Sequence, residues 1–253
     1  MYIKLTTYCN MQCAHCCGSH GPKRGKHMDE RTLIRTLDLC VEHGSSPYIG
    51  GGEPTVHPKF WQFLGLILGR AHEFEMEMLG MHTNGKRKAD ALALAALAKR
   101  GVLGVTLSRD SFHEPIDHDV VEAFTKTGSS GSMTSSWWER DTPSRRDPHD
   151  LRFVVDGANK SVVAQGRARN ITGARTDCCV CEDLQVDPDG VIWACGCERT
   201  QFGTVWKPRL PDNAFEYACW ERERAAEERM EKLKSDALRT ELVRGVSADL
   251  IAM

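Results

Sequence analysis

Predicted strands and helices alternate along the amino-terminal half of this 253-residue chain, and this order limits the fold more than any other feature. The apolar stretch YIKLT predicts a strand, and the helix after it carries Leu33, Ile34, Leu37 and Val41 along one side. SPYIGGGEP, FEMEMLGMHTNG and VLGVTLSRDS each contain a further strand, with apolar helices between them. Such alternation predicts an α/β fold, in which helices cover a mainly parallel sheet.

The alternation lapses after residue 126. Residues 127–150 are rich in Ser, Gly and Pro and predict a long loop, where Trp137 and Trp138 form a hydrophobic flap or stack on a substrate. Strand-like segments up to residue 169 complete the sheet, and EDLQVDPDGVIWACG predicts a β-hairpin with DPDG as its turn. We expect a main α/β domain over residues 1–169, a cysteine-rich hairpin region over 170–212 and a charged helical tail over 213–253.

Composition excludes several classes of function. A net charge of −2 predicts neither a protein that binds nucleic-acid backbones nor a polybasic membrane partner. The sequence shows no secretory signal and no run of about 18 apolar residues, so we expect a soluble cytoplasmic protein. Because cytoplasmic thiols are kept reduced, the eleven cysteines predict thiolate and metal chemistry instead of a disulfide framework.

Four cysteines lie within YCNMQCAHCC, and Cys9, Cys13 and Cys16 have the spacing CxxxCxxC. Three thiolates on one loop leave a metal coordination position free for another molecule, whereas structural zinc usually takes four ligands. The motif resembles CxxxCx(aromatic)C, the hallmark of the radical S-adenosylmethionine (SAM) superfamily, with His15 at the aromatic position. The resemblance implies that the three cysteines ligate a 4Fe-4S cluster whose fourth iron is chelated by SAM. Cys17 lies outside the motif and is expected to pack as a small apolar residue.

Polar segments at three predicted strand ends, and one late barrel segment, resemble the superfamily's cofactor-binding motifs. They are GGEP, in which Glu53 would accept from the methionyl ammonium group, TNG, LSRDSFHE and QGRA, whose Arg167 would reach the cofactor carboxylate. Taken alone, the strand-end segments could equally form turns or helix caps. Arg167 could equally be a surface residue. The resemblance implies a partial (β/α)6 barrel of the radical SAM type. The residues expected to bind SAM are Gly51, Gly52, Glu53, Pro54, Asn84, Ser108, Asp110 and Arg167.

The second cysteine group surrounds the predicted hairpin. Cys181 is followed by Gly190 and Cys195, which resembles the signature of the SPASM and twitch extensions that bind auxiliary clusters. The hairpin turn would bring Cys181 and Cys195 together. Because only Cys219 follows Cys197, we expect one auxiliary 4Fe-4S cluster of the shorter twitch kind, with a zinc knuckle as the alternative. The expected ligands are Cys178, Cys181, Cys195 and Cys197, with Cys179 as an alternative to Cys178.

The resemblance implies an oxidoreductase or isomerase that cleaves SAM reductively and abstracts hydrogen from a substrate C–H bond through a 5′-deoxyadenosyl radical. The electron would come from an external flavodoxin or ferredoxin. The first loop is similar to that of small phage-encoded members thought to act on amino-acid-modified thymidine in DNA. We expect a substrate with an amino-acid-like moiety, borne by a peptide or attached to a nucleobase, although no peptide-recognition domain is visible before Tyr2. The alternative is a non-catalytic iron-sulfur or zinc protein with a redox or regulatory role, which leaves GGEP unexplained.

Overall fold

The computed structural model describes residues 1–74, 79–109, 112–126, 152–153, 166–172, 184–212 and 214. The loop predicted over residues 127–150, including Trp137 and Trp138, lies outside the described residues. The tail predicted over residues 213–253 also lies outside them, apart from Ala214. Among the residues singled out from the sequence, the same is true of Asp110, Cys178, Cys179, Cys181 and Cys219.

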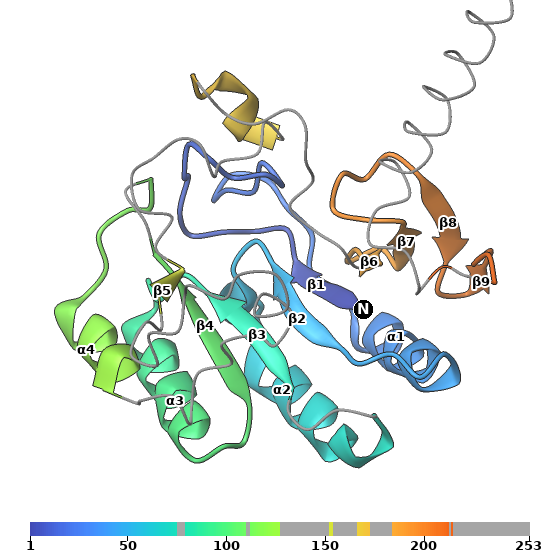
Figure 1. Cartoon of the computed structure of the whole chain (residues 1–253), viewed down its shortest axis with the longest axis horizontal. Helices are drawn as coiled ribbons and strands as arrows, with labels where there is room; N and C mark the ends of the chain where they lie inside the picture. Colours follow the sequence, from blue (N-terminus) through green and yellow to red (C-terminus); the bar gives the residue numbers. More distant parts are fainter. Residues whose placement is uncertain are drawn as a thin grey trace, which may run out of the picture.

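The described strands form one mixed sheet in the order β5-β4-β3-β2-β1-β6-β7-β8-β9 (Figure 1). The strands are β1 (Tyr2–Thr6), β2 (Tyr48–Gly51), β3 (Gly80–Thr83), β4 (Gly104–Ser108), β5 (Arg152–Phe153), β6 (Gln185–Val186), β7 (Val191–Trp193), β8 (Gln201–Thr204) and β9 (Lys207–Pro208). Strands β1 to β6 pair in parallel, and the pairs from β6 to β9 are antiparallel. The expected α/β fold is confirmed, and over the described residues the sheet stays open instead of closing into a barrel.

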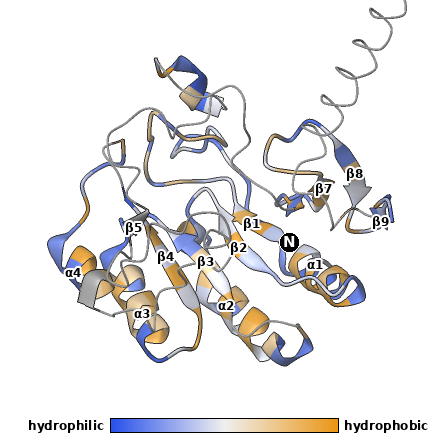
Figure 2. Cartoon of the chain, in the orientation of Figure 1, coloured by the Kyte–Doolittle hydropathy of each residue, from blue (hydrophilic) through white to orange (hydrophobic). Residues whose placement is uncertain are grey.

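Four helices cover one face of the parallel strands (Figure 1). They are α1 (Glu30–Glu42), α2 (Phe60–Gly69), α3 (Lys88–Lys99) and α4 (His118–Lys126), and short 3-10 helices follow β2 (η1, Pro54–Val56) and α2 (η2, Ala71–Glu73). Ile3, Leu5, Ile49, Met81 and Val105 of the strands are buried in the resulting apolar core. Figure 2 shows the apolar residues along α2 and α3 and on the strands beside them. None of the described helices has the length and apolar character needed to cross a membrane.

The opposite face of the sheet carries polar side chains. In β1, Tyr2, Lys4 and Thr6 alternate with the core residues Ile3 and Leu5, so they point away from the helices. Lys4 is buried on this face although it is a lysine. A buried ammonium group requires a partner, and Glu198, just after β7, forms an ion pair with it. This face therefore differs chemically from the apolar face under the helices.

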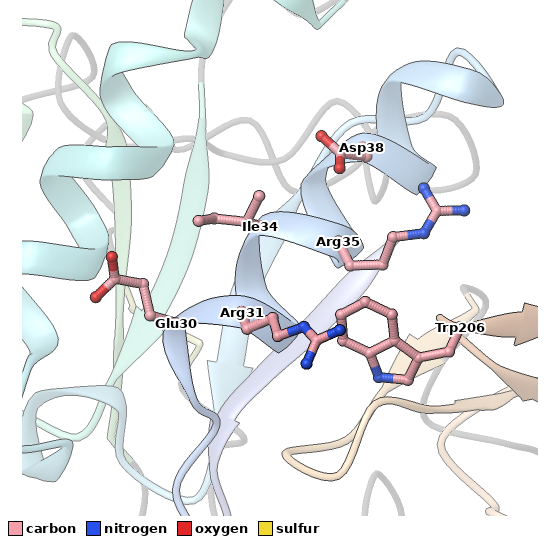
Figure 3. Close-up of a pocket in the computed structure, with 6 residues that line it drawn as sticks. All are labelled: Glu30, Arg31, Ile34, Arg35, Asp38 and Trp206. Carbon is pink, nitrogen blue, oxygen red and sulfur yellow. The ribbon is translucent and has the colours of Figure 1, made fainter.

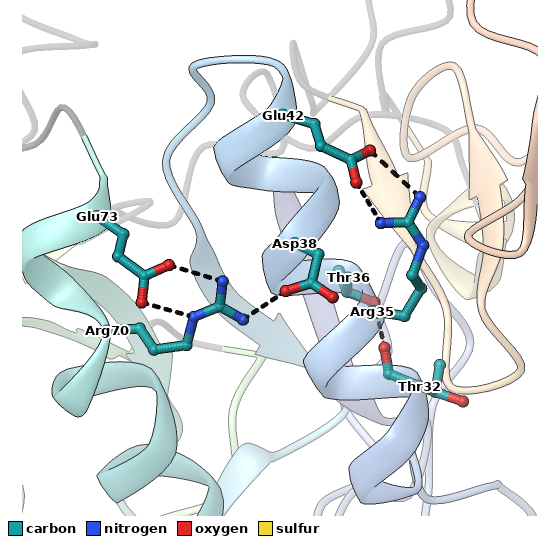
Figure 4. A network of polar contacts seen from close by, with 7 residues as sticks. All are labelled: Thr32, Arg35, Thr36, Asp38, Glu42, Arg70 and Glu73. Carbon is teal, nitrogen blue, oxygen red and sulfur yellow. Dashed lines mark hydrogen bonds and ion pairs between the residues drawn. The ribbon is translucent and has the colours of Figure 1, made fainter.

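Ion pairs hold α1 against the end of α2 (Figure 4). The Arg70 guanidinium donates to Asp38 of α1 at 2.8 Å and to both carboxylate oxygens of Glu73 at 2.8 and 2.9 Å. On the same helix Arg35 donates to Glu42 at 2.6 Å. Such partly exposed pairs contribute only about 0 to 1 kcal/mol each to stability. They orient the helix layer, while the buried apolar core supplies most of the stability.

The predicted hairpin is present as β6 and β7. Gln185 pairs with Trp193 and Val186 with Ile192, and the Asp187 carboxylate closes the turn by accepting from the Asp189 N–H at 3.0 Å. Because β6 also pairs with β1, the hairpin extends the main sheet. The boundaries expected at residues 169 and 212 stay a prediction.

One segment differs from the expected secondary structure. Residues 166–168 were expected to continue a strand, but Gly166–Asn170 forms the 3-10 helix η4. Gly166 has a φ of +55°, and a Cβ at this position would lie 2.1 Å from the carbonyl oxygen of Cys17. The two backbones therefore approach closely, and η4 packs on the first cysteine loop. The local sequence pattern does not indicate this contact.

Candidate functional site

The first cysteine group lies on a closed loop at the carboxyl end of β1. Backbone hydrogen bonds from Met28 to Leu5, from Thr7 to Lys26 and from Cys9 to Gly21 join the two ends of this loop. Cys9, Cys13 and Cys16 therefore sit on one compact loop at the edge where parallel α/β sheets gather their functional residues.

Backbone N–H groups point at two of the three sulfurs. The Met11 N–H donates to Cys9 Sγ at 3.4 Å, and the His20 N–H donates to Cys16 Sγ at 3.3 Å. Such donors stabilise negative charge on a cysteine sulfur. Burial nevertheless raises the pKa of Cys9 to about 11, helped by the nearby Glu53 carboxylate and against the effect of the Met11 N–H. A bound metal cation would overcome this penalty, because coordination deprotonates a thiol.

The spacing of the thiols suits a multi-iron cluster better than one zinc ion. Among the described His, Cys, Asp and Glu side chains, only His118, Asp119 and Glu122 bring three ligand atoms within 4.8 Å of one another. At least one pair of the three sulfurs of the first group is therefore more than 4.8 Å apart. A tetrahedral zinc ion with Zn–S bonds of about 2.3 Å requires sulfurs about 3.8 Å apart, whereas the thiolates of a 4Fe-4S cluster bind different irons.

The GGEP segment packs directly against the start of the cysteine loop. Gly51 has a φ of +119°, and a Cβ on Gly52 would lie 2.0 Å from the carbonyl oxygen of Tyr8. The Gly52 N–H donates to Thr6 O at 2.7 Å, and the Glu53 N–H donates to Tyr8 O at 2.8 Å. Glycines are needed here because the two backbones touch.

The Glu53 carboxylate joins the ends of β2 and β3. It is 1% exposed and accepts from Thr55 Oγ1 at 2.6 Å, from Thr83 Oγ1 at 2.9 Å and from the Asn84 N–H at 2.7 Å. Burial raises the pKa of Glu53, and these hydrogen bonds oppose the rise. A direct contact with the cofactor ammonium was expected from the sequence. In the structure Glu53 also accepts hydrogen bonds from protein groups, and the sequence did not indicate these donors. Pro54 follows Glu53 as the first residue of η1.

Asn84 lies between the β3 end and the cysteine loop. Its side-chain Nδ2 donates to Cys9 Sγ at 3.5 Å and to Asn10 Oδ1 at 2.8 Å. Its Oδ1 accepts from the Lys86 N–H at 3.0 Å. The amide expected to bind SAM is therefore in contact with Cys9, one of the expected cluster ligands.

The segment after β4 contacts the same loop. Ser108 is the last residue of β4. Thr83, the last residue of the neighbouring strand β3, pairs with Leu107, so both strands end at the same edge of the sheet. Further on, Phe112 and His113 contact the His15 ring at centroid distances of 5.2 and 4.8 Å. Sequence reasoning did not assign a role to Phe112 or His113. The histidine at the usually aromatic position of the motif, His15, is the one sequence feature that could have pointed to ring partners such as these.

Arg167 reaches the cysteine loop from η4. The Arg167 N–H donates to Cys16 O at 3.1 Å, and its guanidinium Nη2 is buried without a hydrogen-bond partner. A buried guanidinium nitrogen with an unused N–H suits a carboxylate or another anion. The structure thus brings this residue to the cysteine loop, while its expected contact with the cofactor carboxylate stays a prediction.

Two of the five cysteines in the second group, Cys195 and Cys197, are among the described residues. Cys195 is buried and Cys197 is half-buried, and both lie between β7 and β8. The Glu198 N–H donates to Cys195 O at 3.1 Å, and the Glu198 side chain pairs with Lys4 of β1. Cys17 is half-buried, and desolvation raises the pKa of its thiol while the Lys4 charge opposes the rise. The packing role expected for Cys17 stays a prediction.

A separate hollow of about 380 Å³ lies between α1 and the turn after β8 (Figure 3). Arg31 of α1 lies over the Trp206 ring at 4.7 Å from its centroid. The residues that line the hollow are Glu30, Arg31, Ile34, Arg35, Asp38 and Trp206. None of them belongs to the cysteine loop or to the strand ends that face it.

Comparison with known proteins decides the family. The Radical SAM superfamily model matches residues 3–130, which contain the first cysteine group and three of the strand-end motifs. The chain belongs to the radical SAM superfamily. Members of this superfamily bind a 4Fe-4S cluster and SAM, so both are implied here. The three free thiols on one loop and the unpartnered Arg167 nitrogen suit these two groups.

Two kinds of curated radical SAM protein resemble up to half of the chain. The tungsten-containing aldehyde ferredoxin oxidoreductase cofactor-modifying protein of Pyrococcus furiosus is 33% identical over 113 residues, which are 44% of this chain and 30% of that protein. The mycofactocin maturase MftC of Mycobacterium tuberculosis is 32% identical over 128 residues, 50% of this chain and 30% of that protein. The similarity thus spans about a third of either relative.

Two solved structures share the radical SAM fold. BtrN, in complex with AdoMet and 2-DOIA, has a TM-score of 0.52 at 14% identity, over 84% of this chain and 80% of BtrN. The enzyme anSMEcpe with bound AdoMet has a TM-score of 0.51 at 15% identity, over 88% of this chain and 82% of that chain. At these identities the likeness concerns the fold alone. It supports the partial barrel expected from the sequence.

Proposed function

We propose that this radical SAM enzyme binds its 4Fe-4S cluster through Cys9, Cys13 and Cys16. The observation that carries the proposal is the convergence of the GGEP segment, Asn84 and Arg167 on one cysteine loop. When bound, the cluster and SAM would supply a 5′-deoxyadenosyl radical that abstracts hydrogen from a substrate C–H bond.

Residues around the loop would bind and orient SAM. The unpartnered Nη2 of Arg167 would donate to the SAM carboxylate. Glu53, held by Thr83 and Asn84, would keep the GGEP backbone in place and offer its charge to the methionyl ammonium group. Gly51, Gly52 and Pro54 shape that backbone, and Ser108 with Asp110 would contact the rest of the cofactor.

Side chains from the β4 end would keep water away from the reacting groups. The Phe112 and His113 rings pack on His15, and the Gln12 N–H donates to Glu114 Oε1 at 3.2 Å. These contacts fasten the segment after β4 across the cysteine loop. Exclusion of water matters because it limits side reactions of reactive intermediates.

We also propose an auxiliary 4Fe-4S cluster at the second cysteine group. Cys195 and Cys197 would supply two ligands from the turn after β7, and Cys181 with Cys178 or Cys179 would supply the others. The Lys4–Glu198 ion pair supports the proposal, because it joins this turn to β1 directly below the first cysteine loop. Iron, sulfide and zinc analysis of the anaerobically purified chain separates this proposal from a zinc knuckle.

The proposed substrate carries an amino-acid-like moiety, borne by a peptide or attached to a nucleobase such as a hypermodified thymidine in phage DNA. The relatives' names refer to the modification of a cofactor and to mycofactocin maturation. These names support a substrate that is a chemical group already built by other enzymes and then modified. The chain would work in the cytoplasm with an external flavodoxin or ferredoxin as electron donor. The net reaction would be an oxidation or an isomerisation, with SAM either consumed or recycled.

Anaerobic reconstitution followed by dithionite and SAM tests the proposed function. The expected product is 5′-deoxyadenosine, measured by liquid chromatography with mass detection. A chain with fully loaded clusters that forms no 5′-deoxyadenosine would refute the radical mechanism. Release of S-adenosylhomocysteine would instead indicate methyl transfer.

A further inference from the structure

The Asn84 side chain has an orientation that its neighbours determine. Its Oδ1 accepts from the Lys86 N–H at 3.0 Å, so the NH₂ group must point the other way. That group donates to Asn10 Oδ1 at 2.8 Å and to Cys9 Sγ at 3.5 Å. Both amide hydrogens are used, and one of them points at a cluster sulfur.

The backbone of Asn84 is held as firmly as its side chain. The Asn84 N–H donates to the buried Glu53 carboxylate at 2.7 Å, and Asn84 itself is 6% exposed. Two N–H groups thus converge on Cys9 Sγ, one from the Met11 backbone and one from the Asn84 amide. Only the second can be removed by changing a side chain.

We infer that Asn84 is a positioning residue that raises the reduction potential of the 4Fe-4S cluster through its hydrogen bond to Cys9. The inference rests on the proposed function, because it requires the cluster to bind at Cys9. Reduction places additional negative charge on the cluster and its sulfurs. An N–H dipole aimed at one sulfur stabilises the reduced form more than the oxidised form, and burial strengthens the effect.

The test is an EPR-monitored redox titration of the reconstituted full-length chain in the absence of SAM. The relevant signal is identified in a parallel sample as the one that changes when SAM is added. In Asn84→Ala the ratio of reduced to oxidised cluster at a fixed potential should fall about tenfold, a shift of about 59 mV for one electron. Asn84→Asp, which places an acceptor against the sulfur, should shift the potential further in the same direction.

Asn10→Ala is the matched control, because it removes the other partner of the same amide and leaves the hydrogen bond to Cys9. Its potential should equal that of the wild-type protein. An unchanged potential in Asn84→Ala, or an equal fall in Asn10→Ala, would overturn the inference.

A second measurement applies even if the Asn84 variants fail to hold the cluster. In Asn10→Ala protein labelled with ¹⁵N at asparagine side chains, pulsed EPR of the reduced cluster should detect a weakly coupled nitrogen. Absence of that coupling would also overturn the inference. Failure of the proposed function is distinguishable, because it appears as missing 5′-deoxyadenosine and leaves the potentials measured without SAM unchanged.

Discussion

Arg167 Nε donates a hydrogen bond of 2.8 Å to the carbonyl oxygen of Cys13, a residue 154 positions earlier in the chain. The contact fastens η4 to the loop that carries the first cysteine group. It also leaves the Nη2 of the same guanidinium buried and unpartnered beside that loop. The arginine thus holds the loop with one nitrogen and offers another to an anion.

Arg167→Lys should weaken SAM binding by roughly 10- to 100-fold. A charge-assisted hydrogen bond contributes about 1.5 to 3 kcal/mol, and lysine keeps the charge but lacks the planar fork of N–H groups. Equilibrium binding of SAM to the reconstituted protein measures the effect. Arg169→Lys, on an exposed position of the same short helix, is the control and should bind SAM normally. Equal affinities for wild-type and Arg167→Lys protein would contradict the assignment.

Cysteine substitutions should separate the two proposed clusters. Cys13→Ala should lose the SAM-responsive cluster and all SAM cleavage, whereas Cys195→Ala should lower only the auxiliary iron. Cys17→Ala should retain both clusters, because the Cys17 thiol is predicted to pack and not to ligate. Iron and sulfide analysis with Mössbauer spectroscopy measures each variant. Full iron content in both Cys13→Ala and Cys195→Ala would rule out the two-cluster arrangement.

Glu53→Ala should lower the free energy of unfolding by about 2 to 4 kcal/mol, because it leaves the buried donors of Thr83 and Asn84 unpaired. SAM binding should weaken at the same time. Urea denaturation under anaerobic conditions provides the measurement. Glu73→Ala, which breaks a partly exposed ion pair with Arg70, should cost much less than Glu53→Ala because water screens that pair. Weakened SAM binding at unchanged stability would instead indicate that Glu53 acts mainly on the cofactor.

Stability should fall as the pH is lowered below about 6.5, partly through His82. Burial lowers the pKa of His82 from 6.5 to about 4. Between these values the unfolded chain binds a proton at this residue that the folded chain does not, so unfolding becomes more favourable as the pH falls. His82 contributes at most about 1.4 kcal/mol per pH unit to the slope of the free energy of unfolding against pH. Urea denaturation between pH 5.5 and 7.5 should show a steeper slope for the wild-type protein than for His82→Gln. Parallel slopes would show that His82 does not contribute.

The two partners of the Lys4–Glu198 ion pair should respond unequally to substitution. The Lys4 side chain is 5% exposed and the Glu198 side chain 41%. Glu198→Gln leaves a buried ammonium group without its carboxylate, whereas Lys4→Met leaves a carboxylate that water can reach. We expect Glu198→Gln to destabilise the protein more, by about 1 to 2 kcal/mol relative to Lys4→Met. Urea denaturation tests this order, and the reverse order would show that Glu198 is the more costly group to leave unpaired.

Local patterns in the sequence predicted the strands, the helices and the β6–β7 hairpin. They succeeded because hydrophobic periodicity and turn residues act over a few positions. The same locality explains the error at Gly166–Asn170. That segment is a 3-10 helix because its backbone meets the carbonyl oxygens of Cys16 and Cys17, and no nearby residue signals such a distant contact.

The sequence by itself determined the α/β class and the three cysteines of the superfamily motif, because both depend on spacing along the chain. Only the tertiary structure decided how the strand ends meet. It joins Asn84 to Glu53 across 31 positions and to Cys9 across 75, and it places Arg167 on Cys13 across 154. These contacts depend on strand order and on the direction of each side chain. Neither is encoded in any single segment, which is why the sequence named the residues of the site but not the bonds between them.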